Sequence, residues 1–508
     1  MRSPRIIALA VTALLLAAGC GAADDGSPTG AAPGRPDPRA EVDVRLLLEP
    51  TSLDITKVAG AALEQILLGN VYEGLVKYTD DGKIEPGLAA LPEVSGDGLT
   101  YTFTLNRATF HDGSPVTAAD VEDSFGKVIA ADSVNPAKAS FASVEKVEAK
   151  DDTTVVITLA RRDTTFLYAL AGRGGVVLKK GAANRLDDSE NGTGPFRLQN
   201  WQRGSTITFV RDDAYWGQAK AKVAKVVFHY IADENTALNA LRAGEIDLYT
   251  GTTGDSYAAV QGDPGFTVTT GNSNTIFVLA FNNSRGPLKD PRVRHALRRA
   301  VDKDGLVTTL GGDHLYAKAG SHTAPTDPWY EDLTSIDSYD PAAAKALLAQ
   351  AGHAAGLDLE LTVPNIYPST MADYIAAQYK AVGVNLKVNT VEFGVWLDKV
   401  YTKADYDLSL VAHVEPLTIL QYAQPGYYWR YDNPDVRKWT EEAISAGSDA
   451  ERDTLLGQVA RKISEDAAAD WVVRSLSTSI ARPGVTGFPK NDTNARLDLS
   501  GLTVTTPR

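Results

Sequence analysis

Cysteine is nearly absent from this chain, since Cys20 is the only one among 508 residues. No disulfide can therefore form within one chain, and stability must come from hydrophobic cores. A chain of this length is too long for one core, so we expect two or three lobes. Basic residues are in the minority, with 50 Lys and Arg against 64 Asp and Glu and a net charge of −14. This acidity argues against a nucleic acid partner, whose phosphates would be repelled.

Long apolar runs are also scarce. One such run, residues 6–18, follows two arginines at the N-terminus and is too short to span a bilayer as a helix. A basic start, a short apolar stretch and small residues before Cys20 predict a secretory signal peptide over residues 1–19. Residues 17–20, "AAGC", resemble the lipobox of bacterial lipoproteins, although the preferred leucine lies one place early, at Leu16.

In lipoproteins of that kind, the cysteine is acylated and becomes the new N-terminus, so the resemblance makes Cys20 a lipid anchor. The alternative is a secreted protein with an unpaired cysteine. Residues 21–40 are rich in Gly, Ala, Ser, Pro and Asp, and we expect a disordered tether there. The folded part would then lie in water beside the extracytoplasmic face of the cell membrane.

Signatures of catalysis are missing as well. The chain has no G-x-S-x-G motif, and "SFGK" (124–127) and "SVEK" (143–146) lack the S-D-N and K-T-G elements that penicillin-recognising enzymes need. "GRGG" (172–175) lacks the third glycine of a dinucleotide loop and is read as a turn. The 7 histidines are scattered, so no metal site is expected. We therefore expect a binding protein that is not an enzyme and has no cofactor.

Local patterns predict a mixed α/β fold with more than one lobe. Residues 99–106 alternate as in a half-buried strand, and Thr117 with Asp120 resembles a capping box that starts a helix. Residues 357–391 read as strand, helix and strand, which favours parallel pairing. Helical spacing predicts one helix over 61–76 and another over 450–473.

A cluster of basic residues lies on a helix that is expected to start at Asp290 and Pro291. Its members are Arg292, Arg294, His295, Arg298 and Arg299. These residues could form an anion site, but the apolar stripe of the same helix favours a solvated face.

Several stretches, in their order along the chain, resemble one family. They are "NVYEGLVKYTDDGKIEPGLA", "LTYTFTLNRATFHDGSPVTAADVEDSF", "GTGPFRLQNWQRGSTITFVRDDAYWG", "ENTALNALRAGEIDLYTG", "FNNSRGPLKDPRVRHALRRAVDKDGLV" and "YDPAAAKALLAQAG". Together they resemble the family 5 solute-binding proteins of ABC importers, which include the dipeptide and oligopeptide-binding proteins. The resemblance runs from about Val44 to the end of the chain.

The resemblance implies a periplasmic-binding-protein-like fold of class II, a three-lobed clam with mixed sheets and a hinge of two strands. Lobe I would comprise residues 41–70, 190–274 and 481–508, lobe II the insert 71–189, and lobe III residues 275–480. A solute would bind between lobes I and III, and the closed protein, expected to be a monomer, would dock on a permease that ATPase subunits drive.

Six residues are candidates for contact with the solute. Thr250 and Gly251 follow a predicted strand, where ligands of α/β sheets bind. In peptide-binding members of the family a carboxylate pairs with the ammonium of the peptide. The matching segment of this chain lacks the expected Asp, and the nearest residues are His413 and Glu415. Glu415 could take the ammonium, or it could make a structural hydrogen bond in its loop.

The run "GYYWRY" (426–431) supplies Tyr428 and Trp429 as a possible pocket wall, with a hydrophobic plug between lobes as the alternative. Three functions stay open at this point. The first is an import receptor for peptides or a peptide-like solute. The second is a receptor for a non-peptide solute such as a nickel chelate or an oligosaccharide. The third is a membrane-anchored scaffold or regulator of envelope assembly that has lost transport.

Overall fold

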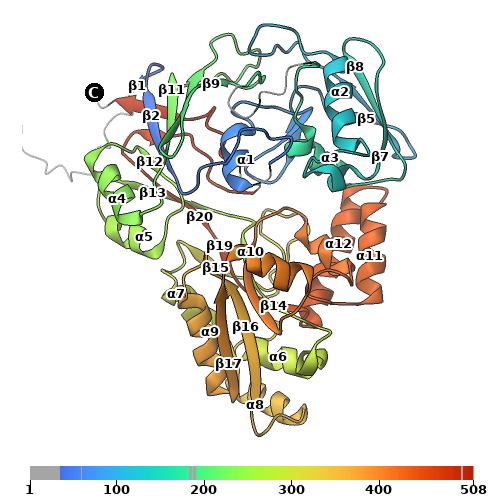
Figure 1. The fold of residues 1–508 in the computed structure, drawn as a ribbon, viewed down its shortest axis with the longest axis vertical. Helices are drawn as coiled ribbons and strands as arrows, with labels where there is room; N and C mark the ends of the chain where they lie inside the picture. Colours follow the sequence, from blue (N-terminus) through green and yellow to red (C-terminus); the bar gives the residue numbers. More distant parts are fainter. Residues whose placement is uncertain (1–34, 59, 182–185, 187–189, 494–495, 507–508) are drawn as a thin grey trace, which may run out of the picture.

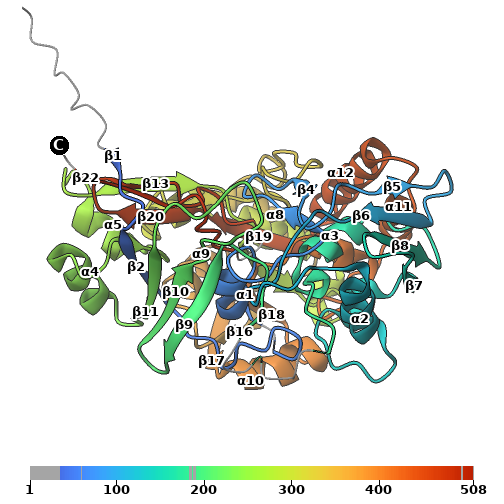
Figure 2. The same cartoon turned by 90° about the horizontal axis from the view of Figure 1, so that it is seen from above.

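The computed structural model describes residues 35–506, apart from residues 59, 182–185, 187–189 and 494–495 (Figure 1). The predicted signal peptide, Cys20 and most of the predicted tether lie outside the described residues. The described residues form three sheets of four or more strands. We keep the name lobe I for the part around the seven-stranded sheet, lobe II for the part around the four-stranded sheet and lobe III for the part around the six-stranded sheet. Lobes I and II lie side by side with lobe III below them (Figures 1 and 2).

The sheet of lobe I has the strand order β13-β20-β12-β2-β11-β10-β9 and mixes parallel with antiparallel pairs. Its strands are β2 (Glu41–Leu46), β9 (Phe196–Gln202), β10 (Thr206–Arg211), β11 (Lys225–Tyr230), β12 (Leu248–Tyr249), β13 (Thr267–Gly271) and β20 (Ser477–Ala481). Lobe I also contains α1 (Ala61–Leu67), α4 (Glu234–Ala243), α5 (Gly254–Val260) and a small sheet of β1 (Arg35–Pro36), β21 (Val485–Thr486) and β22 (Thr503–Thr506). The side chains of Val42, Val44 and Leu46 on strand β2 pack into the same core, because alternate side chains of a strand share a face.

Lobe II is built on an antiparallel sheet with the order β5-β6-β8-β7. Its elements are β3 (Val76–Tyr78), β4 (Ile84–Pro86), β5 (Glu93–Val94), β6 (Thr100–Thr104), α2 (Ala118–Ile129), η1 (Lys138–Phe141), β7 (Val144–Ala149), β8 (Thr154–Leu159), α3 (Phe166–Ala171) and η2 (Arg173–Gly175). The predicted capping box is confirmed, since Thr117 N donates to Asp120 Oδ2 over 2.8 Å at the start of α2.

Lobe III is built on the sheet β15-β19-β14-β18-β16-β17. Its strands are β14 (Ile276–Phe281), β15 (Tyr316–Lys318), β16 (Leu357–Pro364), β17 (Val384–Val391), β18 (Leu408–His413) and β19 (Ala469–Ser475). Its helices are η3 (Gly286–Lys289), α6 (Pro291–Arg299), α7 (Lys303–Thr309), α8 (Pro341–Gln350), α9 (Thr370–Ala381), α10 (Phe393–Trp396), η4 (Leu397–Thr402), η5 (Thr418–Ala423), α11 (Pro434–Ile444) and α12 (Asp449–Glu465). The parallel pairing predicted for residues 357–391 is confirmed by β16 and β17.

Both faces of this sheet are covered. Along β14, Val278 and Ala280 pack into the cluster that contains residues of α11 and α12, whereas Leu279 and Phe281 pack into the cluster under α6, α8 and α9. This alternation follows from the two-residue period of a strand. It explains why β14 and β19 read as almost continuous apolar runs.

Two pairs of consecutive strands connect lobe I to lobe III. Strand β13 leads into β14 through residues 272–275, and β19 leads into β20 through Leu476. Residues 477–480 pair within the seven-stranded sheet, so they belong to lobe I, whereas the sequence placed them in lobe III. The other expected boundaries stay predictions.

Lobe II joins lobe I where two backbone segments cross closely. A Cβ added to Gly192 would lie 1.9 Å from Val71 O, and one added to Gly194 would lie 2.4 Å from Asn70 O. No other residue fits so close an approach of two backbones. The glycines of "GTGPF" are therefore required by the packing of the crossing segments.

Two predicted helices are shorter than their patterns suggested. Helix α1 ends at Leu67 instead of near residue 76, because Gly69 takes a left-handed φ of 79° that stops the helix. Helix α12 ends at Glu465, and residues 469–475 form the buried strand β19. A short, wholly buried apolar run does not distinguish helix from strand by its period.

The predicted solvated face of helix α6 is wrong for two of its arginines. Arg294 and Arg298 are buried, although they share the basic cluster with exposed Arg292. Arg294 donates to the backbone oxygens of Asp466 and Ala467, over 2.8 and 2.9 Å. These carbonyls lie at the C-terminal end of α12, where helices leave acceptors unpaired. The two arginines thus attach α6 to α12.

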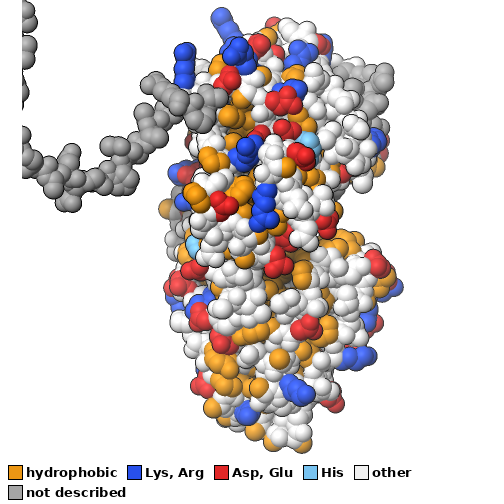
Figure 3. All heavy atoms as spheres, turned by 90° about the vertical axis from the view of Figure 1, so that its left-hand side faces the viewer, with side chains coloured by type: hydrophobic (Ala, Val, Ile, Leu, Met, Phe, Trp, Pro, Cys, Tyr) orange, Lys and Arg blue, Asp and Glu red, His pale blue; other side chains and the backbone are white. Residues whose placement is uncertain are grey.

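The surface carries acidic and basic side chains interspersed with apolar ones over the face shown in Figure 3. No helix among residues 35–506, as far as they are described, has both the length and the apolar character needed to cross a membrane.

Candidate functional site

A cavity of about 780 Å³ lies between lobes II and III. We call it the chamber. It is lined by Glu64 of α1, by Leu68 directly after that helix, by Tyr78, and by residues within 136–140, 161–174, 415–424 and 437–444. Helix α1 is the contribution of lobe I to this wall. The volume falls within the range of pockets that hold small ligands.

Two ion pairs fix parts of the chamber wall. Glu64 of α1 contacts Arg173 of η2, and Arg173 Nη1 also donates to Val58 O over 2.8 Å. Burial lowers the pKa of Arg173. Asp432 pairs with Arg437 at the start of α11. These charges are compensated within the protein and hold α1, η2 and α11 in place.

Three charged side chains of the chamber have no ion-pair partner among the described residues. They are Arg161 on the side of lobe II, and Glu415 and Glu441 on the side of lobe III. All three are exposed, so water solvates them in this structure. A solute that displaced this water would need groups of opposite charge at the same places.

Glu415 follows the end of β18 at His413, in a loop whose Leu417 has a φ of 61°. Its Oε2 accepts from Val414 N over 3.3 Å, and its backbone oxygen accepts from Thr418 Oγ1 over 2.8 Å. The structure therefore contains the loop hydrogen bond that the sequence left as one alternative. The carboxylate still faces the chamber, and its contact with a solute stays a prediction.

His413, Tyr428 and Trp429 are brought together, but inside lobe III. His413 Nε2 lies 2.9 Å from Tyr428 Oη, and the Trp429 ring stacks on Tyr422 with centroids 4.1 Å apart. All three residues are buried, and none of them lines the chamber. Burial lowers the pKa of His413 to about 4, so the ring is neutral at pH 7. His413 is the last residue of β18, and Tyr428 and Trp429 belong to the buried core of lobe III.

Thr250 and Gly251 line a second cavity, of about 380 Å³, at the connection between lobes I and III. We call it the hinge cavity. Arg45 fixes their loop, since its Nη1 donates to Thr250 O over 2.6 Å and its backbone oxygen accepts from Thr250 Oγ1 over 2.7 Å. Helix α1 separates the two cavities, with Ala61 on the hinge side and Glu64 on the side of the chamber. Of the six predicted site residues, Glu415 therefore lines the chamber and Thr250 and Gly251 line the second cavity, whereas the other three line neither.

Lobe II touches lobe III beside the chamber. Thr164 donates from its backbone N to Ile444 O and from Oγ1 to Ala443 O, each over 2.8 Å. Arg162 Nη1 donates to Ala446 O over 3.2 Å. The acceptors lie at the C-terminal end of α11, whose last carbonyls have no partner within the helix. We call this contact, between residues 162–164 and 443–446, the clasp.

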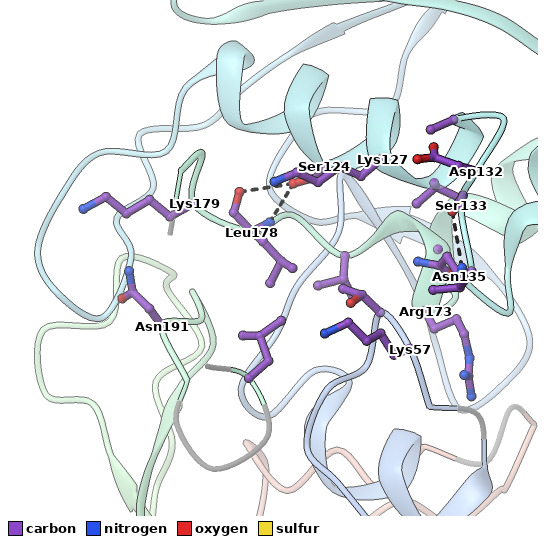
Figure 4. A pocket seen from close by; sticks show the side chains of 17 residues that line it. Lys57, Ser124, Lys127, Asp132, Ser133, Asn135, Arg173, Leu178, Lys179 and Asn191 are labelled. Atoms are coloured by element: carbon purple, nitrogen blue, oxygen red, sulfur yellow. Dashed lines mark hydrogen bonds between the residues drawn. The ribbon is translucent and has the colours of Figure 1, made fainter. Parts of the chain in front are cut away.

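A third cavity, of about 320 Å³, lies where lobes I and II meet (Figure 4). Its wall includes Ser124 and Lys127 of the "SFGK" motif. The Ser124 hydroxyl donates to Leu178 O over 3.1 Å and accepts from Leu178 N over 2.9 Å, while Lys127 pairs with Asp123. The serine is therefore engaged with the backbone as a structural link.

Sequence reasoning missed the contribution of lobe II to the chamber. Arg161 lies two residues after the end of β8, but nothing in the local sequence indicates that another lobe faces it. Within the described ranges, no three His, Cys, Asp or Glu side chains are grouped so that they could hold a metal ion.

The middle part of the chain matches a family model. Residues 83–422 match the bacterial extracellular solute-binding proteins, family 5. The chain is 31% identical over 369 residues to the dipeptide-binding protein of Escherichia coli K12, which covers 65% of this chain and 68% of that protein. It is 28% identical over 473 residues to heme-binding protein A of Haemophilus influenzae, which covers 82% of this chain and 84% of that protein.

Solved structures agree with this assignment at the level of the fold. The ABC transporter substrate-binding protein CtaP of Listeria monocytogenes superposes with a TM-score of 0.82 at 24% identity, covering 92% of this chain and 100% of that one. The oligopeptide-binding protein AppA of Bacillus subtilis, in complex with a nonapeptide, gives 0.76 at 22% identity, covering 93% and 100%. The predicted fold class is confirmed. The chain belongs to the bacterial extracellular solute-binding proteins of family 5, the substrate-binding proteins of ABC transporters.

Proposed function

We propose that this chain captures a peptide or a peptide-like solute outside the cytoplasm and delivers it, unchanged, to the permease of an ABC importer. The observation that carries the proposal is the chamber, a cavity of about 780 Å³ with walls from all three lobes. A solute in it would contact lobe III together with lobe II and helix α1. It would therefore favour the arrangement in which these walls are close, which is a shift of population toward a closed state.

The proposed site extends the one expected between lobes I and III. Helix α1 is common to the chamber and the hinge cavity, so a solute lying along α1 could reach both. Leu47 and Leu48 line the hinge cavity and are 51% and 62% exposed. Covering such apolar area contributes about 25 cal/mol per Å² to binding. Thr250 and Gly251 would contact the end of the solute nearest the hinge.

Glu415 is the proposed partner for the ammonium of the solute. It is exposed, lines the chamber and follows β18, the strand after which the family places its ammonium-binding carboxylate. His413, Tyr428 and Trp429 would act behind it. The rings of His413 and Tyr428 are stacked, and this contact together with their hydrogen bond holds the end of β18 in position.

The proposed location of the protein rests on its N-terminal sequence. Signal-peptide removal before Cys20 and acylation of its thiol would leave a lipid-anchored monomer on the extracytoplasmic face of the cell membrane. The permease and its ATPase subunits are the proposed partners, and ATP hydrolysis belongs to them. No catalysis is proposed for this chain.

A non-peptide solute is the second candidate. The observation that favours it is the segment after β18, which has Glu415 but not the Asp of peptide-binding relatives. The relatives named above include one called a heme-binding protein. A scaffold of the envelope without transport is the remaining alternative.

Native mass spectrometry of the tag-free protein, followed by calorimetry with the species found, tests the proposal. A defined set of co-purifying peptides that rebind to the stripped protein is the expected result. Glu415→Gln is expected to rebind these peptides more weakly. Glu93→Gln is its matched control, because Glu93 is an exposed carboxylate of lobe II outside the chamber. A co-purifying non-peptide solute would support the second candidate. Repeated absence of any small molecule, with no thermal shift across a peptide library, would contradict both.

A further inference from the structure

Arg161 has a combination of features that sets it apart from its neighbours in lobe II. It follows β8, it lines the chamber and it is exposed. By contrast, the side chains of residues 162–165 are all hydrogen-bonded: Arg162 to Asp97 O, Asp163 to Ser143 and Thr165, and Thr164 to Ala443 O. No bond or ion pair is found for the Arg161 side chain among the described residues.

The backbone that carries Arg161 is held on both sides. Strand β8 pairs with β6 and β7 before it, and the clasp attaches residues 162–164 to α11 after it. The position of the arginine relative to lobe III is therefore defined, while its guanidinium stays available. Such an arrangement suits a group whose partner arrives from outside the protein.

Apart from Glu64, Arg173 and Arg437, which are paired within the protein, the charges of the chamber are separated by lobe. The unpaired guanidinium of Arg161 belongs to lobe II, whereas the unpaired carboxylates of Glu415 and Glu441 belong to lobe III. Their surroundings are mostly apolar or uncharged, and include Leu417 and Ile444. A solute with an anionic end toward lobe II and a cationic end toward lobe III would match this pattern.

We propose that Arg161 binds the carboxylate of the solute, and that the chamber therefore selects zwitterionic solutes with a free acid at the end that faces lobe II. This inference rests on the proposed function. A guanidinium presents two parallel N–H donors that match the two oxygens of a carboxylate, and the pair gains strength as the solute displaces water from the chamber. Glu441 and Glu415 disfavour the reverse orientation, since they would repel the same carboxylate.

The test compares trialanine with trialanine amide by calorimetry, on the wild-type protein, Arg161→Gln and Arg161→Lys. The two probes differ only in the charge at the C-terminal end. The wild type is expected to bind the free acid at least tenfold more tightly than the amide. Arg161→Gln should lose this preference by binding the acid more weakly, while its affinity for the amide stays unchanged. Arg161→Lys should keep part of the preference, because a lysine retains the charge but not the paired donors.

Arg107→Gln is the control, since Arg107 is an exposed arginine of lobe II that does not line the chamber. Unchanged binding of the amide by Arg161→Gln shows at the same time that the variant is folded. Equal affinity of the wild type for both probes would overturn the inference and leave the proposed function standing. An equal loss of affinity for both probes in Arg161→Gln would also overturn the inference and leave the proposed function standing. If neither probe nor any co-purified peptide binds the wild type, the proposed function fails and this inference fails with it.

Discussion

The clasp between lobes II and III is expected to stabilise the arrangement seen in this structure. The test is the double variant Thr164→Val with Arg162→Met. The first change removes the bond from Thr164 Oγ1 to Ala443 O, and the second removes the bond from Arg162 Nη1 to Ala446 O. Both substitutions keep most of the side-chain volume, so packing is little altered.

The magnitude follows from the two lost bonds. A hydrogen bond of this kind contributes about 0.5–1.5 kcal/mol net, so the pair contributes about 2 kcal/mol. Since about 1.4 kcal/mol is a tenfold change in an equilibrium, the ratio of clasped to open molecules should fall by roughly 30-fold. The backbone bond from Thr164 N to Ile444 O remains in the variant, so the clasp is weakened but not abolished.

Pulsed electron–electron double resonance measures this change in the ratio of clasped to open molecules. Spin labels at Lys150→Cys in lobe II and Lys438→Cys in lobe III, in a chain with Cys20 replaced, report the distance between two exposed positions. The unliganded double variant should show a longer and broader distance distribution than its parent. Arg107→Met, outside the clasp, is the control. Identical distributions for parent and double variant would refute the reasoning that these contacts hold the lobes together.

Three further predictions concern the site and the fold. Glu415→Gln should lower the affinity for a peptide with a free amine by about tenfold, as measured by calorimetry, because the free ammonium pairs with the carboxylate. The affinity for the N-acetylated form of the same peptide should stay unchanged. Burial lowers the pKa of His413 to about 4, below its unfolded value of about 6.5, so the unfolded chain binds more protons between these values. Stability should therefore fall as the pH drops from about 6.5 to about 4, and the difference in Tm between the wild type and His413→Gln should change over that window. Gly175→Ala should destabilise the protein by about 1–3 kcal/mol in urea unfolding, since its Cβ would lie 1.8 Å from Leu170 O; an unchanged midpoint would show that the turn can relax.

Local chemistry made much of the fold predictable. The helix starts at Thr117 and Asp290 were recognisable because a side chain of the right type satisfies backbone donors within its own turn. The parallel pair at residues 357–391 was predictable because one helix connects its strands. These features depend on short segments of sequence.

Features that depend on distant partners were not predictable. The pattern of α6 does not reveal that Arg294 will meet the carbonyls at the end of α12, 172 residues away for Asp466. The chamber is made by three lobes, so no single stretch contains its signal. Arg161 and Glu415 lie far apart in the sequence and in different lobes, and only Glu415 was a candidate. Tyr428 and Trp429 were grouped correctly, but a run of aromatic residues does not distinguish a pocket wall from a core.

The central claim is that a solute binds between walls from different lobes and draws them together. Small-angle X-ray scattering of the solute-free and solute-saturated protein tests it most directly, with a co-purified peptide as the solute. The account predicts a smaller radius of gyration and a shorter maximum dimension when the peptide is bound. Identical scattering curves, at a peptide concentration that calorimetry shows to be saturating, would contradict it.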